Sequence, residues 1–267
     1  MITINDIINK KNKEKITMLT AYDYQMGKLA DESGIDIVLV GDSLGMVVLG
    51  YETTLEVTID NMIYHSKAVK KGLKNSFLLV DMPFLSYNVD IKDSIYNAGQ
   101  LVTKGFAQGV KIEGGKRTIE TVQKIVEMEI PVAGHLGLTP QSVNRMGGFK
   151  MQGKLKEDAI NMIEDAIALE KAGAFCIVLE GIPENLGKKI TESVSIPTIG
   201  IGAGRYTDGQ VLVNYDMLGF NEKVPKFVKK YTNSKNILGD AIKSYIDEVK
   251  NGTFPNDDYK YNVDSDI

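Results

Sequence analysis

Short apolar runs that end in an acidic residue recur four times in this chain, and they constrain its fold more than any other feature. Ile37–Val40 leads into Asp42 after one glycine, and the runs FLLVD, GVKIE and CIVLE end in Asp81, Glu113 and Glu180. Apolar runs of this length are typical of strands that are buried on both faces, as in a parallel sheet. The sequence therefore predicts parallel strands that bring four carboxylates to one end of the sheet.

Strand-like and helix-like segments alternate along the chain, which predicts an α/β fold. The expected strands are Ile16–Tyr22, Asp36–Asp42, Phe77–Pro83, Val110–Gly114, Pro131–Gly137, Phe175–Glu180, Pro197–Gly204 and Gly209–Gly219. Helical patterns separate most of them: Tyr22–Gly34, Val57–Gly72, Asp90–Ala107, Thr118–Glu129, Lys154–Ala172 and Pro183–Val194. The same alternation allows a doubly wound open sheet. We favour a TIM (β/α)8 barrel, because eight such units in about 220 residues close without a leftover domain.

The chain is expected to form one domain over residues 1–267, with the barrel at about residues 16–220. A short helix that Thr3 can cap precedes the barrel and runs to about Lys11. Helical stretches at Lys223–Lys230 and Ile237–Val249 follow the barrel, and the tail from Asn251 is polar and acidic. Leu138–Gly153 is long, has little periodic pattern and marks a candidate lid or binding loop.

Composition excludes several classes of function. The net charge of −4 provides no basic surface for nucleic acid. No apolar stretch is long enough to span a membrane, and the polar N-terminus does not resemble a signal peptide. The single cysteine, Cys176, excludes an intrachain disulfide and lies within an apolar run, which is typical of a core residue. We therefore expect a reduced, soluble, cytoplasmic protein.

The carboxylates are candidate metal ligands. Carboxylates repel one another, so their convergence is best explained by a hard cation between them. A strand-end acid can instead cap the next helix, but Asp81 is followed by Met82 and Pro83 and has no helix start to cap. Oxygen ligands without cysteine favour Mg²⁺, Mn²⁺ or Ca²⁺, and a single histidine, His135, makes a poor zinc site.

Other polar residues at the same strand ends indicate an anionic substrate. Lys111 shares a strand face with Glu113, and an ammonium beside a cation can bind a substrate carboxylate, although a structural salt bridge is the alternative. Ser43 can donate to the same substrate. Glu180 could act as a general base if burial raises its pKa. His135 could hydrogen-bond the substrate or be a buried structural histidine.

Several motifs resemble one known family over nearly the whole chain. In order along the chain they are MLTAYDY, VGDSLGMVVLGYETT, LLVDMPF, VKIEGG, GHLGLTPQSV with GGFKMQG, LEGIP, and IGIGAG with DGQVLV. This chain is similar to the ketopantoate hydroxymethyltransferase family. GDSLGM followed by GHLGLTPQ is a far more specific signal than any single motif.

The resemblance implies a TIM barrel that transfers a hydroxymethyl group from 5,10-methylenetetrahydrofolate to 3-methyl-2-oxobutanoate. The product would be 2-dehydropantoate (ketopantoate) of pantothenate biosynthesis, formed through an enolate stabilised by one Mg²⁺ per subunit. The resemblance assigns Asp42, Asp81 and Glu113 to the metal. It assigns Asp42, Ser43, Asp81, Lys111 and His135 to the substrate, and Glu180 to proton transfer. It also implies a homo-oligomer, commonly a decamer of two stacked pentameric rings.

Two other functions remain open at this stage. One is a Mg²⁺-dependent C–C lyase or phosphonomutase of the phosphoenolpyruvate mutase/isocitrate lyase type. Those enzymes usually carry a catalytic loop with a cysteine, whereas Cys176 lies in an expected strand. The other is a barrel that binds a metal or metabolite without catalysis. Turnover of 3-methyl-2-oxobutanoate with methylenetetrahydrofolate would exclude it.

Overall fold

Eight parallel strands form a closed barrel in chain order in the computed structural model, which describes residues 1–261. The strands are β1 (Ile16–Thr20), β2 (Ile37–Val40), β3 (Phe77–Asp81), β4 (Gly109–Glu113), β5 (Val132–Gly137), β6 (Cys176–Glu180), β7 (Thr198–Ile201) and β8 (Gly209–Leu212). Pairing of β8 with β1 closes the circle. The barrel prediction is confirmed, and the open doubly wound sheet is excluded.

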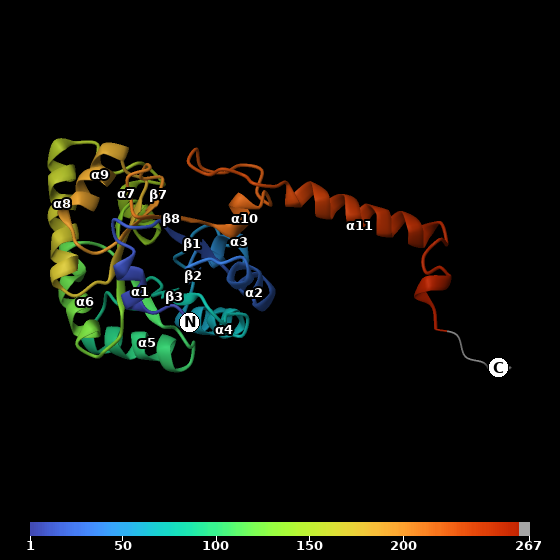
Figure 1. Cartoon of the computed structure of the whole chain (residues 1–267), viewed down its shortest axis with the longest axis horizontal. Helices are drawn as coiled ribbons and strands as arrows, with labels where there is room; N and C mark the ends of the chain where they lie inside the picture. Colours follow the sequence, from blue (N-terminus) through green and yellow to red (C-terminus); the bar gives the residue numbers. More distant parts are fainter. Residues whose placement is uncertain (262–267) are drawn as a thin grey trace. The chain divides into compact units, whose positions relative to one another are not determined.

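Helices surround the strands as the alternating pattern predicts (Figure 1). They are α2 (Tyr24–Glu32), α4 (Ile59–Lys70), α5 (Ile91–Thr103), α6 (Ile119–Val126), α8 (Lys156–Lys171) and α9 (Glu184–Ser193). Residues of β4 are buried throughout, and the same holds for β2 and β3, as expected for strands covered on both faces. The helices thus cover the outside of the barrel and leave its two ends as possible sites.

Helix α1 (Ile4–Asn9) closes the amino-terminal end of the barrel. Thr3 caps it as predicted, through a capping box with Asp6. Ile7 is fully buried and belongs to the same apolar cluster as Phe77 of β3 and Val178 of β6. This end is therefore filled by apolar side chains.

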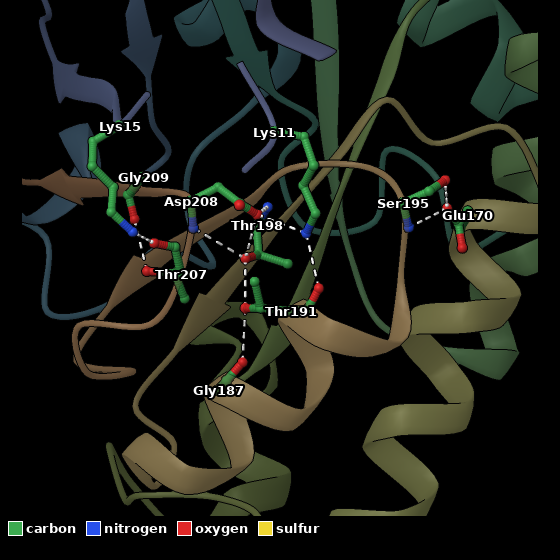
Figure 2. A network of polar contacts seen from close by, with 10 residues as sticks. All are labelled: Lys11, Lys15, Glu170, Gly187, Thr191, Ser195, Thr198, Thr207, Asp208 and Gly209. Carbon is green, nitrogen blue, oxygen red and sulfur yellow. Dashed lines mark hydrogen bonds and ion pairs between the residues drawn. The ribbon is translucent and has the colours of Figure 1, made fainter. Parts of the chain in front are cut away.

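A polar network ties the same end together (Figure 2). Lys11 Nζ donates to the Thr191 carbonyl at 2.8 Å and pairs with Asp208 Oδ2 at 2.8 Å. Asp208 Oδ2 also accepts from the backbone N–H of Thr198 at 2.8 Å. The network links the segment after α1 to α9, to β7 and to the residue before β8. This end of the barrel is therefore held by polar bonds as well as by apolar packing.

Some segments differ from the sequence prediction. The helix expected over Lys223–Lys230 is wrong: these residues form turns and irregular structure, because Pro225 lacks an N–H and restricts the residue before it. The eighth strand stops at Leu212 and is followed by α10 (Asn214–Met217). Short helical segments also occur within the expected loops and near the C-terminus: α3 (Leu44–Val47), η1 (Lys116–Thr118), η2 (Pro140–Ser142), α7 (Val143–Met146) and η3 (Asp257–Tyr259).

The chain divides into two compact units, one over Met1–Asn214 and one that begins at Tyr215. The second contains α11 (Ser234–Lys250), which confirms the last expected helix and has no buried residue within the chain. The organisation of residues 1–267 as one domain stays a prediction. No helix within residues 1–261 is long and apolar enough to cross a membrane.

Candidate active site

The carboxyl ends of neighbouring strands bring the predicted residues together. Asp81, Glu113 and Glu180 are the last residues of β3, β4 and β6, and Asp42 follows β2. Strand register places Asp81 opposite Lys111 and Glu113 opposite His135. Asp42, Asp81, Lys111, Glu113 and His135 are each at most 5% exposed. Parallel strands thus gather these side chains at one buried end, as the sequence predicts.

Lys111 lies at the centre of this cluster. Its Nζ is 3.2 Å from Asp81 Oδ1 and 3.0 Å from His135 Nδ1. Burial lowers the pKa of Lys111, but Asp81, Glu113 and Asp42 outweigh burial and raise the pKa above its usual value. Lys111 is therefore an ammonium and donates to His135. Its ion pair is with Asp81 on the neighbouring strand.

The protonation of His135 follows from this contact. Burial and then Lys111 lower its pKa, so the ring is neutral. Nδ1 accepts from the ammonium, which leaves the proton on Nε2. Nε2 lies 3.3 Å from Glu180 Oε2. His135 thus lies between the Lys111 ammonium and the Glu180 carboxylate, although its Nε2 makes no hydrogen bond of good geometry.

The three acids at β2, β3 and β4 have raised pKa values. Burial raises the pKa of Asp42 well above its usual range, and Asp81 and Glu113 raise it further. Burial also raises the pKa of Asp81, and it raises that of Glu113 to about 7. One ammonium cannot offset three ionised acids in a buried site, so these acids favour the protonated form, and a bound cation would favour the ionised form.

Two carboxylate oxygens test whether these residues suit a divalent cation. Glu113 Oε1 is buried and makes no hydrogen bond, and the buried Asp81 Oδ1 has no hydrogen bond of good geometry although it faces the Lys111 ammonium at 3.2 Å. Hard oxygen atoms without hydrogen bonds are suitable ligands for Mg²⁺, so the residues fit such an ion chemically. However, within residues 1–261 no group of three His, Cys, Asp or Glu side chains is already arranged to hold a metal. The acids are gathered but do not yet surround a common point.

Ser43 lies beside this cluster. A Cβ at Gly41 would be 2.9 Å from Ser43 Oγ and 3.5 Å from Asp81 Oδ2, so both side chains flank this glycine. Ser43 Oγ is 2.9 Å from the hydroxyl of Tyr22. Glycine at position 41 therefore allows the hydroxyl of Ser43 and the carboxylate of Asp81 to approach the same backbone position.

Sequence reasoning missed two residues of the cluster, Gln141 and Tyr87. Gln141 contacts Asp42 and Glu113 directly, and the hydroxyl of Tyr87 donates to Gln141 Oε1 at 2.6 Å. Gln141 lies in the loop predicted to bind a ligand and in the motif GHLGLTPQSV. That motif was the only signal that could have indicated it, since the loop has no periodic pattern.

Two cavities adjoin the cluster. One, of about 530 Å³, is lined by His135 and by cationic side chains of Lys116, Arg117 and Arg145. Its wall includes residues of the 138–153 loop. The other, of about 420 Å³, is lined by Tyr87, Gln141 and Arg117 among others. The first cavity has the size of a typical small-molecule site and reaches the histidine of the cluster.

Comparisons with known proteins agree with the sequence resemblance. The model of a family described as ketopantoate hydroxymethyltransferase matches residues 1–257. A 3-methyl-2-oxobutanoate hydroxymethyltransferase from Clostridium kluyveri is 58% identical over 97% of this chain and 92% of its own length. The enzyme of the same name from Clostridium beijerinckii is 56% identical over 96% of this chain and 93% of its own.

Solved structures similar to this chain have the same fold at low sequence identity. A phosphonopyruvate hydrolase aligns with a TM-score of 0.65 at 10% identity, covering 99% of this chain and 92% of its own. A 2,3-dimethylmalate lyase of the PEP mutase/isocitrate lyase superfamily aligns with a TM-score of 0.61 at 13% identity, covering 98% and 92%. The hydrolase was also solved in complex with oxalate and Mg²⁺ (TM-score 0.61, 11% identity, covering 98% and 93%). These likenesses concern the fold alone.

Proposed function

The chain belongs to the ketopantoate hydroxymethyltransferase family, and from this membership we propose how its barrel mouth carries out one-carbon transfer. The acceptor is 3-methyl-2-oxobutanoate, the donor is 5,10-methylenetetrahydrofolate, and the product is 2-dehydropantoate of pantothenate biosynthesis. The observation that carries the proposal is a chain of close contacts from Lys111 to His135 and from His135 to Glu180. This chain of contacts lies beside the acids at the ends of β2, β3 and β4.

Asp42, Asp81 and Glu113 are the residues that would hold the divalent cation, Mg²⁺. When bound, this cation supplies positive charge that polarises a carbonyl group and makes the neighbouring C–H more acidic. Glu113 Oε1, which lacks a hydrogen bond, supports this assignment, and Asp81 Oδ1 would bind the cation beside the Lys111 ammonium.

Each remaining residue has a role that its contacts support. The Lys111 ammonium and the Ser43 hydroxyl bind the carboxylate of the keto acid and offset negative charge that develops during the reaction. Glu180, whose side chain is 16% exposed, accepts the proton from C3 of the acceptor. The Nε2 atom of His135 lies 3.3 Å from Glu180 Oε2, close enough to donate to this carboxylate after a small adjustment. Carbon C3 then forms a bond to the methylene carbon of the donor, the two C–N bonds of that carbon break to release tetrahydrofolate, and a water molecule supplies the hydroxyl group of the product.

The donor is proposed to occupy the cavity of about 530 Å³ that His135 lines. The glutamate tail of a folate is anionic, and Arg145 on the cavity wall supplies a matching charge. Arg145→Ala should raise the KM for the folate and leave C3–H exchange of the keto acid unchanged. Arg205→Ala is the matched control, because Arg205 is exposed and pairs with Glu184. An equal effect of both variants, or a loss of C3–H exchange with Arg145→Ala, would refute this placement.

The experiment that tests the proposed function combines a full turnover assay with a partial reaction. The wild-type chain should form 2-dehydropantoate from the two substrates, and without folate it should exchange the C3 hydrogen of 3-methyl-2-oxobutanoate in deuterium oxide. Glu180→Gln should bind the keto acid and lose the exchange, because an amide cannot accept the proton. Undiminished exchange would remove Glu180 as the base. Cleavage of a C–C or C–P bond instead of turnover would favour the lyase or phosphonomutase alternative.

We also propose a homo-oligomer, a decamer by resemblance, in the cytoplasm. Helix α11 exposes apolar side chains such as Ile237, Ile242 and Tyr245, and such a surface is typical of protein–protein contacts. Light scattering on the full-length chain tests the assembly, and a monomer at micromolar concentration would contradict it.

A further inference from the structure

We infer that Gln141 is a positioning residue that fixes the carboxylates of Asp42 and Glu113 for cation binding without contacting substrate. The inference rests on the cation role proposed above for these acids. It concerns a neutral side chain that neither the motifs nor the comparisons connect with any role.

Gln141 joins the ends of three strands to the loop after β5. It lies in η2 and is 7% exposed. Its side-chain Nε2 donates to Asp42 Oδ2 at 2.8 Å and to the Met82 carbonyl at 2.9 Å. Its backbone N–H donates to Glu113 Oε2 at 3.0 Å. One residue therefore holds two of the three acids and the backbone that follows the third.

The orientation of the Gln141 amide is determined by its surroundings. Asp42 and the Met82 carbonyl are acceptors, so the NH₂ group must face them. The hydroxyl of Tyr87 lies on the oxygen side of the same amide and donates to Gln141 Oε1 at 2.6 Å. Tyr87 is 3% exposed and keeps its proton, because burial raises its pKa well above its usual value. A glutamate here would lack the donors, and an asparagine would be one methylene too short.

The bonds from Gln141 occupy one oxygen of each acid that it holds. They use Asp42 Oδ2 and Glu113 Oε2, while Glu113 Oε1 remains without a hydrogen bond. A carboxylate fixed through one oxygen has its other oxygen held in a defined direction, which lowers the entropic cost of binding a cation. Residues that fix ligating carboxylates typically contribute about 10- to 100-fold to metal affinity.

The test measures Mg²⁺ affinity of the full-length chain by calorimetry in the absence of substrate. Gln141→Met keeps the length of the side chain and the backbone bond to Glu113 but removes the side-chain bonds to Asp42 and Met82, so affinity should fall about 10- to 100-fold. Tyr87→Phe removes one hydroxyl and should weaken binding in the same direction but by less. Gln210→Met is the matched control, because the Gln210 amide donates to the Gly204 carbonyl and Thr207 Oγ1 and not to any of the acids of the cluster within residues 1–261. Its affinity should equal that of the wild-type chain.

The outcomes separate a positioning role from a structural one. If Gln141→Met lowers the melting temperature without Mg²⁺ but keeps wild-type affinity, Gln141 only stabilises the loop and the inference is overturned. If this variant does not fold, Tyr87→Phe decides, and unchanged affinity in it overturns the inference. A wild-type chain that binds no Mg²⁺ refutes the proposed cation role and the inference together. Wild-type binding with unchanged variants refutes the inference alone.

Discussion

Glu113 should make the metal-free protein less stable as the pH rises from 5 to 8. Burial raises its pKa to about 7 from an ordinary value of 4.5. Because the pKa of Glu113 is higher in the folded than in the unfolded state, the protonated carboxyl contributes to the free energy of unfolding. This contribution is fully present below about pH 4.5 and is lost as the pH rises through about 7. At about 1.4 kcal/mol per pKa unit, the difference between about 7 and 4.5 corresponds to about 3.5 kcal/mol, of which about 3 kcal/mol is lost above pH 5.

The melting temperature of metal-free protein at a fixed scan rate provides the assay. For a chain of this size, about 3 kcal/mol corresponds to roughly 6–12 °C. Glu113→Gln keeps the shape of the side chain but cannot ionise, so it is the reference at each pH. His135 acts in the opposite sense: its pKa is lowered, so its contribution is lost as the pH falls below about 6.5. Both proteins contain His135, so the difference between them reports the ionisation of Glu113 together with its effect on the pKa of Asp42.

The wild-type melting temperature should therefore fall relative to Glu113→Gln between pH 5 and 8. A difference that is constant, or that grows with pH, would refute the argument and show that Glu113 is already ionised when buried. Saturating Mg²⁺ should reduce the pH dependence, because a divalent cation favours the ionised carboxylate. A pH dependence that Mg²⁺ leaves unchanged would separate Glu113 from the cation site.

Three further predictions concern other parts of the chain. Asp81→Ala should abolish Mg²⁺ binding in calorimetry while the circular dichroism spectrum stays native, and unchanged affinity would exclude Asp81 as a ligand. Gly137→Ala should destabilise the protein by about 1–3 kcal/mol, because Gly137 has φ +95°. It should also slow C3–H exchange, because a Cβ there would be 2.2 Å from the Glu180 carbonyl oxygen. Native stability in urea would contradict this prediction. Asp208→Asn should lower stability by up to about 3–5 kcal/mol, since it removes the charge that pairs with Lys11, whose side chain is 10% exposed. Exchange activity of the folded enzyme should persist, and an unchanged urea midpoint would show that the pair contributes nothing.

The barrel and its acids were predictable from local patterns. Strand β3 is an apolar run that ends in Asp81, and parallel strands place such ends together whatever the intervening helices contain. The limit of this reasoning appears at Lys111. The sequence allowed a salt bridge to Glu113 or to another acid, and only the register between β3 and β4 places Asp81 opposite Lys111. Pairing across strands depends on register, which a single strand does not encode.

Gln141 shows a different limit. Its partners Asp42, Met82 and Glu113 lie in three other segments of the chain, and only the closed barrel brings them to one loop. The wrong helix at Lys223–Lys230 has a simpler cause, since Pro225 outweighs the helical spacing of its neighbours. Periodicity predicts elements well, but contacts between loops depend on the assembled fold.

The closure of the barrel at its base has a consequence for biosynthesis. Lys11 leaves the ribosome early, but its partners Thr191 and Asp208 lie 180 and 197 residues later. The bonds that fix the segment after the amino-terminal helix therefore cannot form until nearly the whole barrel sequence has been translated, and until then the apolar face of this helix lacks part of its final packing partners. A chain released before residue 208 lacks Asp208 and cannot form the Lys11–Asp208 ion pair. We therefore expect prematurely terminated chains to be substrates for chaperones or proteases.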